Sequence, residues 1–330
     1  MTNDTFAIIR DTDPVAERLR GGVVAIGNFD GVHRGHQAVL RRVIAMARQR
    51  GAPALALTFE PHPRTFFRPD APVFRLTPAD VKAELLAAVG LDGVVEVGFD
   101  KALAAMPAED FVVKLLVERL GATAAVVGYD FHFGKGRAGS PDVLTALGKA
   151  HGFDVEIVSP AGEADTVWSA SGARQALDEG RVEDAARILG YRWFVLGEVV
   201  HGEKRGRDLG FATANIRLAP ETGLMHGVYA VRMRVGDTVY AGAANYGRRP
   251  QFDNGAPLLE VYVLDASPDL YGKTVQVEFV AFIRPELRFD SVDALVERMH
   301  VDVTETRDKL ARAGEQDASG DTLPLSGHAG

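Results

Sequence analysis

The stretch "GGVVAIGNFDGVHRGHQ", residues 21–37, decides the fold of the first half of the chain. It begins with an apolar run, which is typical of a strand whose two faces are both covered. A strand that ends at Gly27, a glycine-containing turn and a helix that begins near Gly35 would present free backbone N–H groups and a positive helix end at one point. The stretch therefore predicts an anion site, where Gly31 and Gly35 allow close backbone approach to phosphate.

Two histidines point to the chemistry of this turn. His33 and His36 would lie on the turn and the first helical residues, aimed at the same point. Two imidazoles can donate hydrogen bonds to phosphoryl oxygens, which suits transition-state stabilisation during attack at phosphorus. A solvated turn with surface histidines is the plainer alternative for an isolated HxxH. A metal site would need a third ligand, and the sequence offers no evident one.

The first half continues as alternating strands and helices. Strands are expected at 21–29, 53–59, 93–99, 123–129 and 153–159, and helices near 35–50, 78–89, 107–120 and 141–151. This alternation predicts a doubly wound α/β sheet, which binds ligands at the carboxyl ends of its strands. Two more polar stretches fall at such ends, "EPHP" (60–63) and "GYDFHFGKGRAG" (128–139). The aromatic residues in the second of these favour a binding loop over a mobile surface loop.

The pattern changes after about residue 190. Residues 228–247 alternate between apolar and polar, with Tyr229, Val231, Met233 and Val235 on one face, and a hairpin turn is expected at 236–237. Further strands are expected at 258–265 and 274–283. A helix near 291–312 would bury Val292, Leu295, Val296 and Met299. These features predict an antiparallel β-barrel domain with a C-terminal helix.

The composition limits the possible classes of protein. The chain has 330 residues, enough for two domains, with a net charge of −8 and no cysteine. The acidic balance argues against a broad basic face for nucleic acid, and the missing cysteines exclude disulfides and thiolate metal sites. The N-terminus lacks the pattern of a signal peptide, and no apolar run reaches transmembrane length. We therefore expect a cytoplasmic protein without a membrane or nucleic-acid partner; the sequence does not indicate its oligomeric state.

Taken together, the motifs resemble one family. "GNFDGVHRGHQ" resembles the GxFDxxHxGH signature of the nucleotidyltransferase superfamily. With "TFEPHP" (58–63), "VGYDFHFGKGRAG" (127–139) and the second half, residues 20–312 resemble the bacterial bifunctional riboflavin kinase/FAD synthetases. The resemblance implies an FMN adenylyltransferase domain over 1–188 and a riboflavin kinase barrel over 189–312. The small polar residues of 313–330 are expected to form a disordered tail.

For the first domain, the resemblance implies transfer of AMP from ATP to FMN, giving FAD and pyrophosphate by direct attack of the FMN phosphate. His33 and His36 match the two histidines that contact the ATP phosphates. The remaining matches form two groups. Gly27, Phe29, Asp30 and Gly35, with Ser171 and Arg174, are assigned to ATP, whereas His62, Pro63, Gly128, Asp130, Phe131 and Gly134 are assigned to the FMN and nucleotide pocket.

For the second domain, the resemblance implies phosphorylation of riboflavin to FMN. Glu260 matches the base that deprotonates the riboflavin 5′-hydroxyl, although a strand carboxylate can also be a solvated edge residue. Thr213 and Asn215, in "ATAN", would hold a Mg²⁺ ion that bridges the ATP phosphates, and strand-end capping is the alternative. The expected ATP loop contains Gly202, Gly206, Arg207 and Gly210, and Arg284 is the expected flavin contact.

Three departures from the family pattern affect these expectations. The segment usually written SSTRIR reads "SASGAR" (169–174), so that a hydroxyl and a basic residue are missing at Ala170 and Gly172. The proline of PTAN is Ala212, and Met225 and His226 stand where proline is common. The first departure predicts weak ATP binding in the first domain, unless positions 170 and 172 do not contact ATP.

Two other functions stay open from the sequence. A nucleotidyltransferase with another phosphorylated acceptor, such as a nicotinamide or pantetheine phosphate, would explain residues 1–190 but not the barrel motifs. A non-enzymatic flavin-binding regulator would not need His33, His36, Thr213, Asn215 and Glu260.

Overall fold

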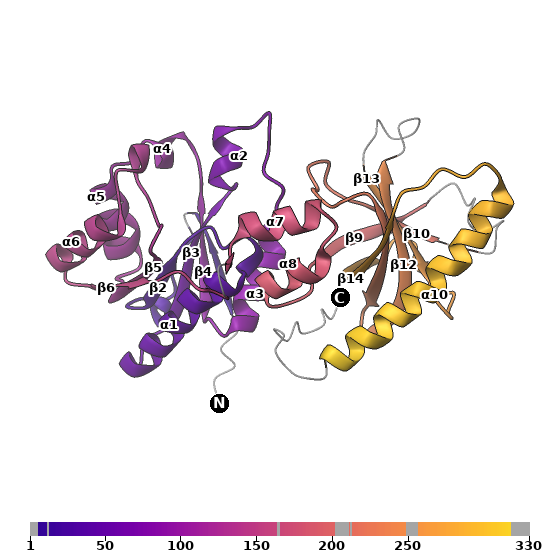
Figure 1. Ribbon diagram of the computed structural model, residues 1–330. Helices are drawn as coiled ribbons and strands as arrows, with labels where there is room; N and C mark the ends of the chain where they lie inside the picture. The colour runs from indigo at the N-terminus through magenta and orange to yellow at the C-terminus, as the bar shows by residue number, and fades with distance from the viewer. Residues whose placement is uncertain are drawn as a thin grey trace. The chain divides into compact units, whose positions relative to one another are not determined.

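The computed structural model describes residues 6–11, 13–163, 166–201, 211, 213–248 and 257–317. The chain divides into two compact units, Met1–Ala170 and Ser171–Gly330, and each is described by itself. Figure 1 shows an α/β unit and a barrel unit.

A parallel sheet forms the centre of the first unit. Its six strands run in the order β1-β4-β3-β2-β5-β6. In chain order they are β1 Ala7–Arg10, β2 Val23–Ile26, β3 Ala54–Glu60, β4 Gly93–Gly98, β5 Ala124–Gly128 and β6 Asp154–Val158. Strand order reverses at β2, because β3 and β4 lie on one side of it and β5 on the other. Doubly wound sheets bind ligands at such a switch point, so the geometry places a site at the end of β2.

Helices cover both faces of this sheet. α1 Arg34–Arg50 and α3 Ala79–Val89 pack on one face. On the other face, α5 Ala108–Phe111 runs into a π-helix, Val112–Arg119, which packs beside α6 Pro141–His151. The short helices are η1 Glu17–Leu19, η2 Asp30–Val32, α2 Pro63–Phe67, α4 Lys101–Ala104 and η4 Lys135–Arg137. A small hairpin, β7 Gly162–Glu163 and β8 Thr166–Val167, ends the unit.

A closed antiparallel barrel forms the second unit, in the order β10-β13-β12-β11-β14-β9. Two helices precede it, α7 Ala170–Asp178 and α8 Val182–Leu189. The strands are β9 Phe194–Val200, β10 Thr213–Arg217, β11 Gly227–Val235, β12 Thr238–Arg248, β13 Pro257–Val263 and β14 Thr274–Pro285. Helix α10, Val292–Asp317, packs along β11, β12 and β14.

The fold class expected from the sequence is confirmed: a parallel α/β domain followed by an antiparallel barrel and a C-terminal helix. Strand β1 was not expected, because "AIIR" is too short to be distinguished from a loop. Tyr229, Val231 and Met233 are fully buried as expected. Val292 is not, since 59% of it is exposed at the first residue of α10, before the helix reaches the barrel.

The unit boundary falls before α7, whereas the sequence places the domain boundary at 188/189. Helix α7 belongs with the barrel unit, because Leu177 accepts a hydrogen bond from the N–H of Met225 at 3.0 Å. The boundary at 188/189 stays a prediction about where each activity resides. Helix α10 continues to Asp317, five residues into the expected tail at 313–330, and the rest of that tail lies outside the described residues.

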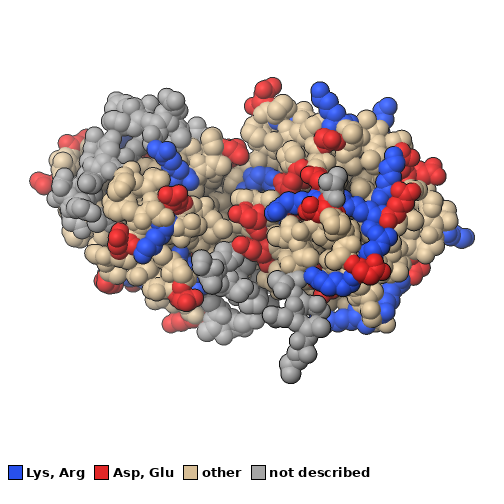
Figure 2. Space-filling view, turned by 180° about the vertical axis from the view of Figure 1, so that it is seen from behind, with Lys and Arg blue, Asp and Glu red and all other residues tan. Residues whose placement is uncertain are grey.

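Charged side chains of both signs are interspersed on the face drawn in Figure 2, so that this face carries no broad field of one sign. None of the described helices combines the length and the apolar content that a membrane-spanning segment requires.

Candidate functional sites

The turn after β2 has an unusual backbone. Phe29 and Val32 adopt positive φ angles of 48° and 34°, and Gly31 between them has a φ of 78°. A positive φ is costly for side chains with a Cβ, and most costly for a β-branched residue such as valine. The turn is therefore held in shape by its surroundings, as is common at functional sites.

His33 and His36 form a fixed pair at the start of α1. The Nδ1 atom of His33 accepts a hydrogen bond from the backbone N–H of His36 at 3.3 Å and so caps the helix. The two rings stack with their centroids 3.6 Å apart, and Phe29 packs edge-on against His36 at 5.2 Å. Because Nδ1 of His33 is an acceptor, a neutral ring carries its proton on Nε2. The pair expected from the sequence is thus brought together at the start of α1.

The glycines of the turn serve the protein's own packing. A Cβ at Gly35 would lie 2.8 Å from the carbonyl oxygen of Trp168, and one at Gly27 would lie 3.2 Å from the Phe29 ring. The guanidinium carbon of Arg34 also lies over the Trp168 ring, 5.6 Å from its centroid. The space that the sequence assigns to phosphate at Gly35 is therefore used by Trp168, and a contact of ATP with these glycines stays a prediction.

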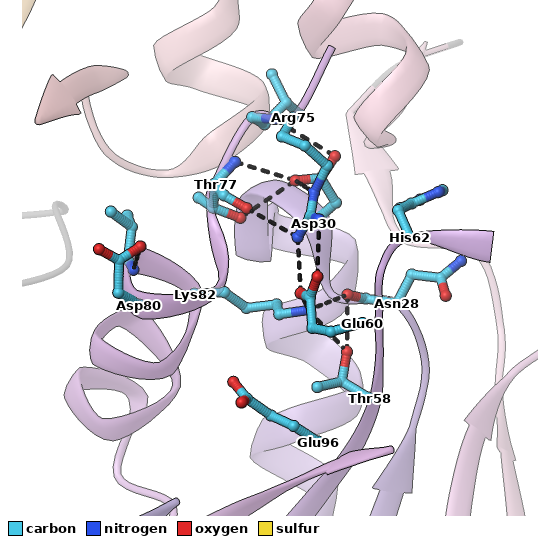
Figure 3. A network of polar contacts seen from close by, with 12 residues as sticks. Asn28, Asp30, Thr58, Glu60, His62, Arg75, Thr77, Asp80, Lys82 and Glu96 are labelled. Carbon is cyan, nitrogen blue, oxygen red and sulfur yellow. Dashed lines mark hydrogen bonds and ion pairs between the residues drawn. The ribbon is translucent and has the colours of Figure 1, made fainter. Parts of the chain in front are cut away.

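Asp30 faces the protein interior. Its carboxylate is 2% exposed and accepts hydrogen bonds from the backbone N–H and the hydroxyl of Thr77, at 3.0 and 3.2 Å. The Thr77 hydroxyl in turn accepts the N–H of Gly31 at 2.8 Å. Asp30 therefore anchors the turn to the segment before α3 (Figure 3). Its expected contact with ATP remains untested.

Four charged residues, Asp30, Glu60, Arg75 and Lys82, lie together at this end of the sheet; we call them the charge network (Figure 3). Glu60 binds the Lys82 ammonium at 2.5 Å and both terminal nitrogens of Arg75, at 2.8 and 2.9 Å. The Nε atom of Arg75 also lies 3.8 Å from the Oδ1 atom of Asp30. Two positive charges balance two negative ones, which makes their burial tolerable.

Burial and pairing act in opposite directions on these groups. Burial alone would raise the pKa of Glu60, but the hydrogen bonds and charges of Arg75 and Lys82 outweigh it and hold the pKa below its ordinary value. Burial lowers the pKa of Lys82, and the attraction of Glu60 offsets this only in part. Arg75 and Lys82 were not among the site residues predicted from the sequence. A lysine among the apolar residues of an amphipathic helix was the available signal, because lysine is rarely buried without a partner.

The predicted flavin-side residues His62 and Pro63 follow β3. The Nδ1 atom of His62 accepts the N–H of Arg64 at 3.1 Å and caps α2, whose first residue is Pro63. In Figure 3 the side chain of Asn28 points toward His62 and away from the charge network. Helix α2 also presents Phe67, which is 65% exposed and packs against Phe66 and Phe99. No sequence pattern singles out this aromatic cluster.

The loop after β5 is partly explained by packing. Phe133 is 6% exposed, and Phe131 stacks on it with ring centroids 5.4 Å apart. The N–H of Phe131 bonds to the carbonyl of Gly128 at 3.1 Å. A Cβ at Gly128 would lie 3.2 Å from the Asp130 carboxylate, and one at Gly134 would lie 2.8 Å from the backbone of Ala108. The expectation that the aromatics mark a binding loop needs this correction: Phe133 belongs to the core.

Ser171 and Arg174 lie in α7, at the start of the second unit. Their contact with ATP therefore stays a prediction.

The barrel carries the second set of predicted residues on three adjacent strands. Asn215 of β10 and Asn245 of β12 both pair with Glu260 of β13. Thr213 lies two residues before Asn215 on the same strand, and paired or alternate residues share one face of a sheet. The sequence expected Thr213, Asn215 and Glu260 together, and the register brings them together.

These strands border a cavity of about 610 Å³. Polar groups on its walls include Thr213, Asn245 and Glu260 from the barrel. Apolar side chains come from the loop before α10 and from α10 itself: Leu287, Phe289, Leu295, Met299 and Val303. The cavity thus combines a polar wall with a wide apolar wall, as suits a ligand with a flat ring and a polar tail.

Arg284 lines this cavity but is already paired. Its guanidinium donates to both carboxylate oxygens of Asp302 in α10, at 2.7 to 3.1 Å, and lies 5.7 Å from the Phe289 ring. Arg298 binds the same carboxylate at 2.9 Å. Arg284 therefore fixes α10 against β14, and its role as a flavin contact stays a prediction.

The fit of Mg²⁺ can be judged from Asn215. Its side-chain oxygen is buried and has no hydrogen-bond partner among the described residues, while its amide nitrogen donates to the carbonyl of Thr213 at 3.3 Å. Hard oxygen atoms of this kind are what Mg²⁺ prefers. The expected ATP loop with Gly202, Gly206, Arg207 and Gly210, together with Ala212, lies outside the described residues.

The two units define the class of protein as a nucleotide-binding α/β domain joined to a ligand-binding barrel. Family models agree with this division: the model described as FAD synthetase matches residues 15–171, and the one described as riboflavin kinase matches residues 189–310.

Curated relatives carry both parts. The bifunctional riboflavin kinase/FMN adenylyltransferase of Escherichia coli K12 is 40% identical over 276 residues, which cover 83% of this chain and 88% of the relative. The protein of the same name from Pseudomonas fluorescens is 38% identical over 301 residues, covering 91% and 96%. The chain belongs to the family of bifunctional riboflavin kinase/FMN adenylyltransferases.

A solved structure shows the same fold. A Streptococcus pneumoniae protein described as a macrolide-efflux protein superposes with a TM-score of 0.83 at 29% identity, covering 91% of this chain and 98% of the other.

Proposed function

We propose that the chain phosphorylates riboflavin in the barrel unit and adenylylates FMN in the α/β unit, with ATP as the donor in both reactions. The family membership supports both activities. The observation that carries the adenylylation site is the stacked, helix-capping pair His33–His36 at the switch point of the parallel sheet.

In the barrel, Glu260 is proposed as the base. It accepts the proton of the riboflavin 5′-hydroxyl while that oxygen attacks the γ-phosphorus of ATP, and ADP leaves. The apolar wall of α10 and its preceding loop holds the isoalloxazine ring, which leaves the ribityl tail directed to the polar wall. Thr213 and Asn215 are proposed to hold Mg²⁺, which neutralises phosphate charge when bound.

In the α/β unit, an FMN phosphate oxygen attacks the α-phosphorus of ATP, and pyrophosphate leaves. The N–H groups at the start of α1 and the imidazoles of His33 and His36 are proposed to donate to phosphate oxygens whose charge grows in the transition state. The aromatic cluster of Phe66, Phe67 and Phe99 offers an apolar surface for the flavin beside His62.

A cytoplasmic location also stays a prediction.

One incubation tests the proposal. The protein is mixed with Mg-ATP and riboflavin, and the flavins are separated by chromatography over time. FMN should form first and FAD second. Riboflavin that stays unchanged would refute the kinase assignment, and supplied FMN that gives no FAD would refute the adenylylation assignment. A second incubation with nicotinamide mononucleotide or phosphopantetheine in place of FMN tests the other acceptors, and no adenylylated product is expected.

A further inference from the structure

The charge network lies between the two turns that the proposed adenylylation uses. One turn follows β2 and carries Asn28 through His33, and the other follows Glu60, the last residue of β3, and carries Pro61 through Pro63. Lys82 comes from α3, which is separated from both turns along the sequence. Its side chain is 1% exposed, so the protein excludes water from an ammonium group at the end of the sheet.

Lys82 joins the two turns through three acceptors. Its Nζ donates to the Thr58 hydroxyl at 3.0 Å and to the Glu60 carboxylate at 2.5 Å, both on β3, and to the carbonyl of Asn28, after β2, at 3.4 Å. The Thr58 hydroxyl donates to the same Asn28 carbonyl at 3.0 Å. The ammonium therefore completes a bridge across the carboxyl ends of two adjacent strands (Figure 3).

An apolar side chain in place of Lys82 would remove one of the two cations that bind the Glu60 carboxylate, which is costly for a buried charge. The ammonium both balances this charge and binds the two turns at once. The Asn28 carbonyl belongs to the strained turn described above, whose shape depends on its neighbours.

We propose that Lys82 is a positioning residue for adenylyl transfer, which fixes the spacing between the phosphate turn after β2 and the flavin-side turn after β3. This inference rests on the proposed adenylylation site. Attack by one bound substrate on another depends on their relative placement, and a displacement of about 1 Å can cost on the order of 10²-fold in rate. Loss of the bridge should therefore lower kcat for FAD formation more than it raises the KM for ATP or FMN.

Lys82→Met tests the bridge, and Leu86→Ala is its matched control. Leu86 lies one turn further along α3 and is fully buried, but its side chain carries no polar atom. Both variants should lower the melting temperature. Only Lys82→Met should lower kcat for FAD formation, by about 10- to 100-fold, when both are measured at a temperature where circular dichroism shows them folded. FMN formation from riboflavin provides an internal control and should be unchanged in both.

Thr58→Val provides a milder test in case Lys82→Met fails to fold. This change keeps the volume and the charges but removes the hydroxyl between Lys82 and Asn28, and it should lower the same kcat by roughly tenfold. Lys82→Arg should retain more activity than Lys82→Met, because a guanidinium can still reach both turns.

The outcomes separate this inference from the proposed function. A wild-type protein that forms no FAD would overturn the proposed function. A wild-type protein that forms FAD, with a Lys82→Met or Thr58→Val variant whose kcat equals that of Leu86→Ala, would show that Lys82 serves stability only.

Discussion

The two candidate sites are built in opposite ways. In the α/β unit, the predicted ligand-binding residues are also structural: His33 caps α1, His62 caps α2 and Asp30 anchors the turn. In the barrel, Thr213 and Glu260 line a cavity, and Asn215 has a buried oxygen without a partner among the described residues. A site made from turns needs its own residues to hold those turns, whereas a site on barrel strands receives its shape from the backbone pairing.

This comparison predicts different responses to substitution. Changes in the turns should affect both geometry and chemistry, and changes on the barrel strands should remove one chemical group at a time.

The largest effect is expected for Glu260→Gln. Loss of a positioned base typically costs about 10²- to 10⁴-fold in rate, so FMN formation should nearly disappear. FAD formation from supplied FMN should be unchanged, and so should the melting temperature, because Glu260 is a partly exposed strand residue. Steady-state rates of both reactions measure this. Equal damage to both activities in a folded protein would contradict the assignment to two sites.

His36→Ala is the corresponding change in the α/β unit. It should lower FAD formation by roughly 10²- to 10³-fold, the usual cost of losing one transition-state donor. The stack with His33 and the edge contact with Phe29 would also be lost, so a small fall in melting temperature should accompany it. The variant should accumulate FMN from riboflavin, which chromatography detects. Normal FAD output would remove the histidine pair from the mechanism.

Asn215→Ala should raise the Mg²⁺ concentration needed for half-maximal FMN formation. Even groups that only orient metal ligands typically cost 10- to 100-fold in metal affinity, so a shift of at least about tenfold is expected. Titration calorimetry with Mg-ADP gives a readout that does not depend on turnover. Unchanged Mg²⁺ affinity would favour strand-end capping as the role of this residue.

Glu60→Gln should alter the pH dependence of stability in the α/β unit. Because the folded pKa of Glu60 lies below its ordinary value of 4.5, its pairing stabilises the fold fully above about pH 4.5. That contribution is lost as the pH falls through the lower folded pKa. The wild-type protein should therefore be more stable than the variant at pH 7, and the difference should shrink below pH 4.5. The rate of thermal inactivation of FAD formation, measured for both proteins at each pH, gives these stabilities. A difference in stability that stays the same at all pH values would contradict this pKa shift.

The smallest effect is expected from restoring the family pattern in "SASGAR". Ala170→Ser with Gly172→Arg should lower the KM for ATP in FAD formation by a few-fold at unchanged kcat, because an exposed ion pair contributes roughly 0.2–1 kcal/mol. An unmoved KM would mean that these positions do not contact ATP. Arg174→Ala is the control, and it should impair adenylylation alone; a silent Arg174→Ala would make this segment a linker.

The sequence by itself determined the fold class and most of the elements. Apolar runs and helix periods are local, so they placed α3 within a residue, gave α6 its bounds and located the β11–β12 turn at 236–237. His33 and His36 were singled out by a local signal, a glycine turn after a strand, whereas Thr213, Asn215 and Glu260 were singled out by the family resemblance; the roles of all five stay predictions.

Only the tertiary structure decided which distant groups meet. Lys82 reaches Glu60 and Thr58 because α3 packs beside β4 and the turn after β2, and Arg284 is held by Asp302 because α10 returns along the barrel. Gly35 lacks a Cβ where the carbonyl oxygen of Trp168 comes close to it. Trp168 lies far along the chain, so the residues around position 35 give no sequence signal for this contact. Such choices depend on burial and on the pairing of charges across the fold, since a buried charge is tolerated only where a partner from another element arrives.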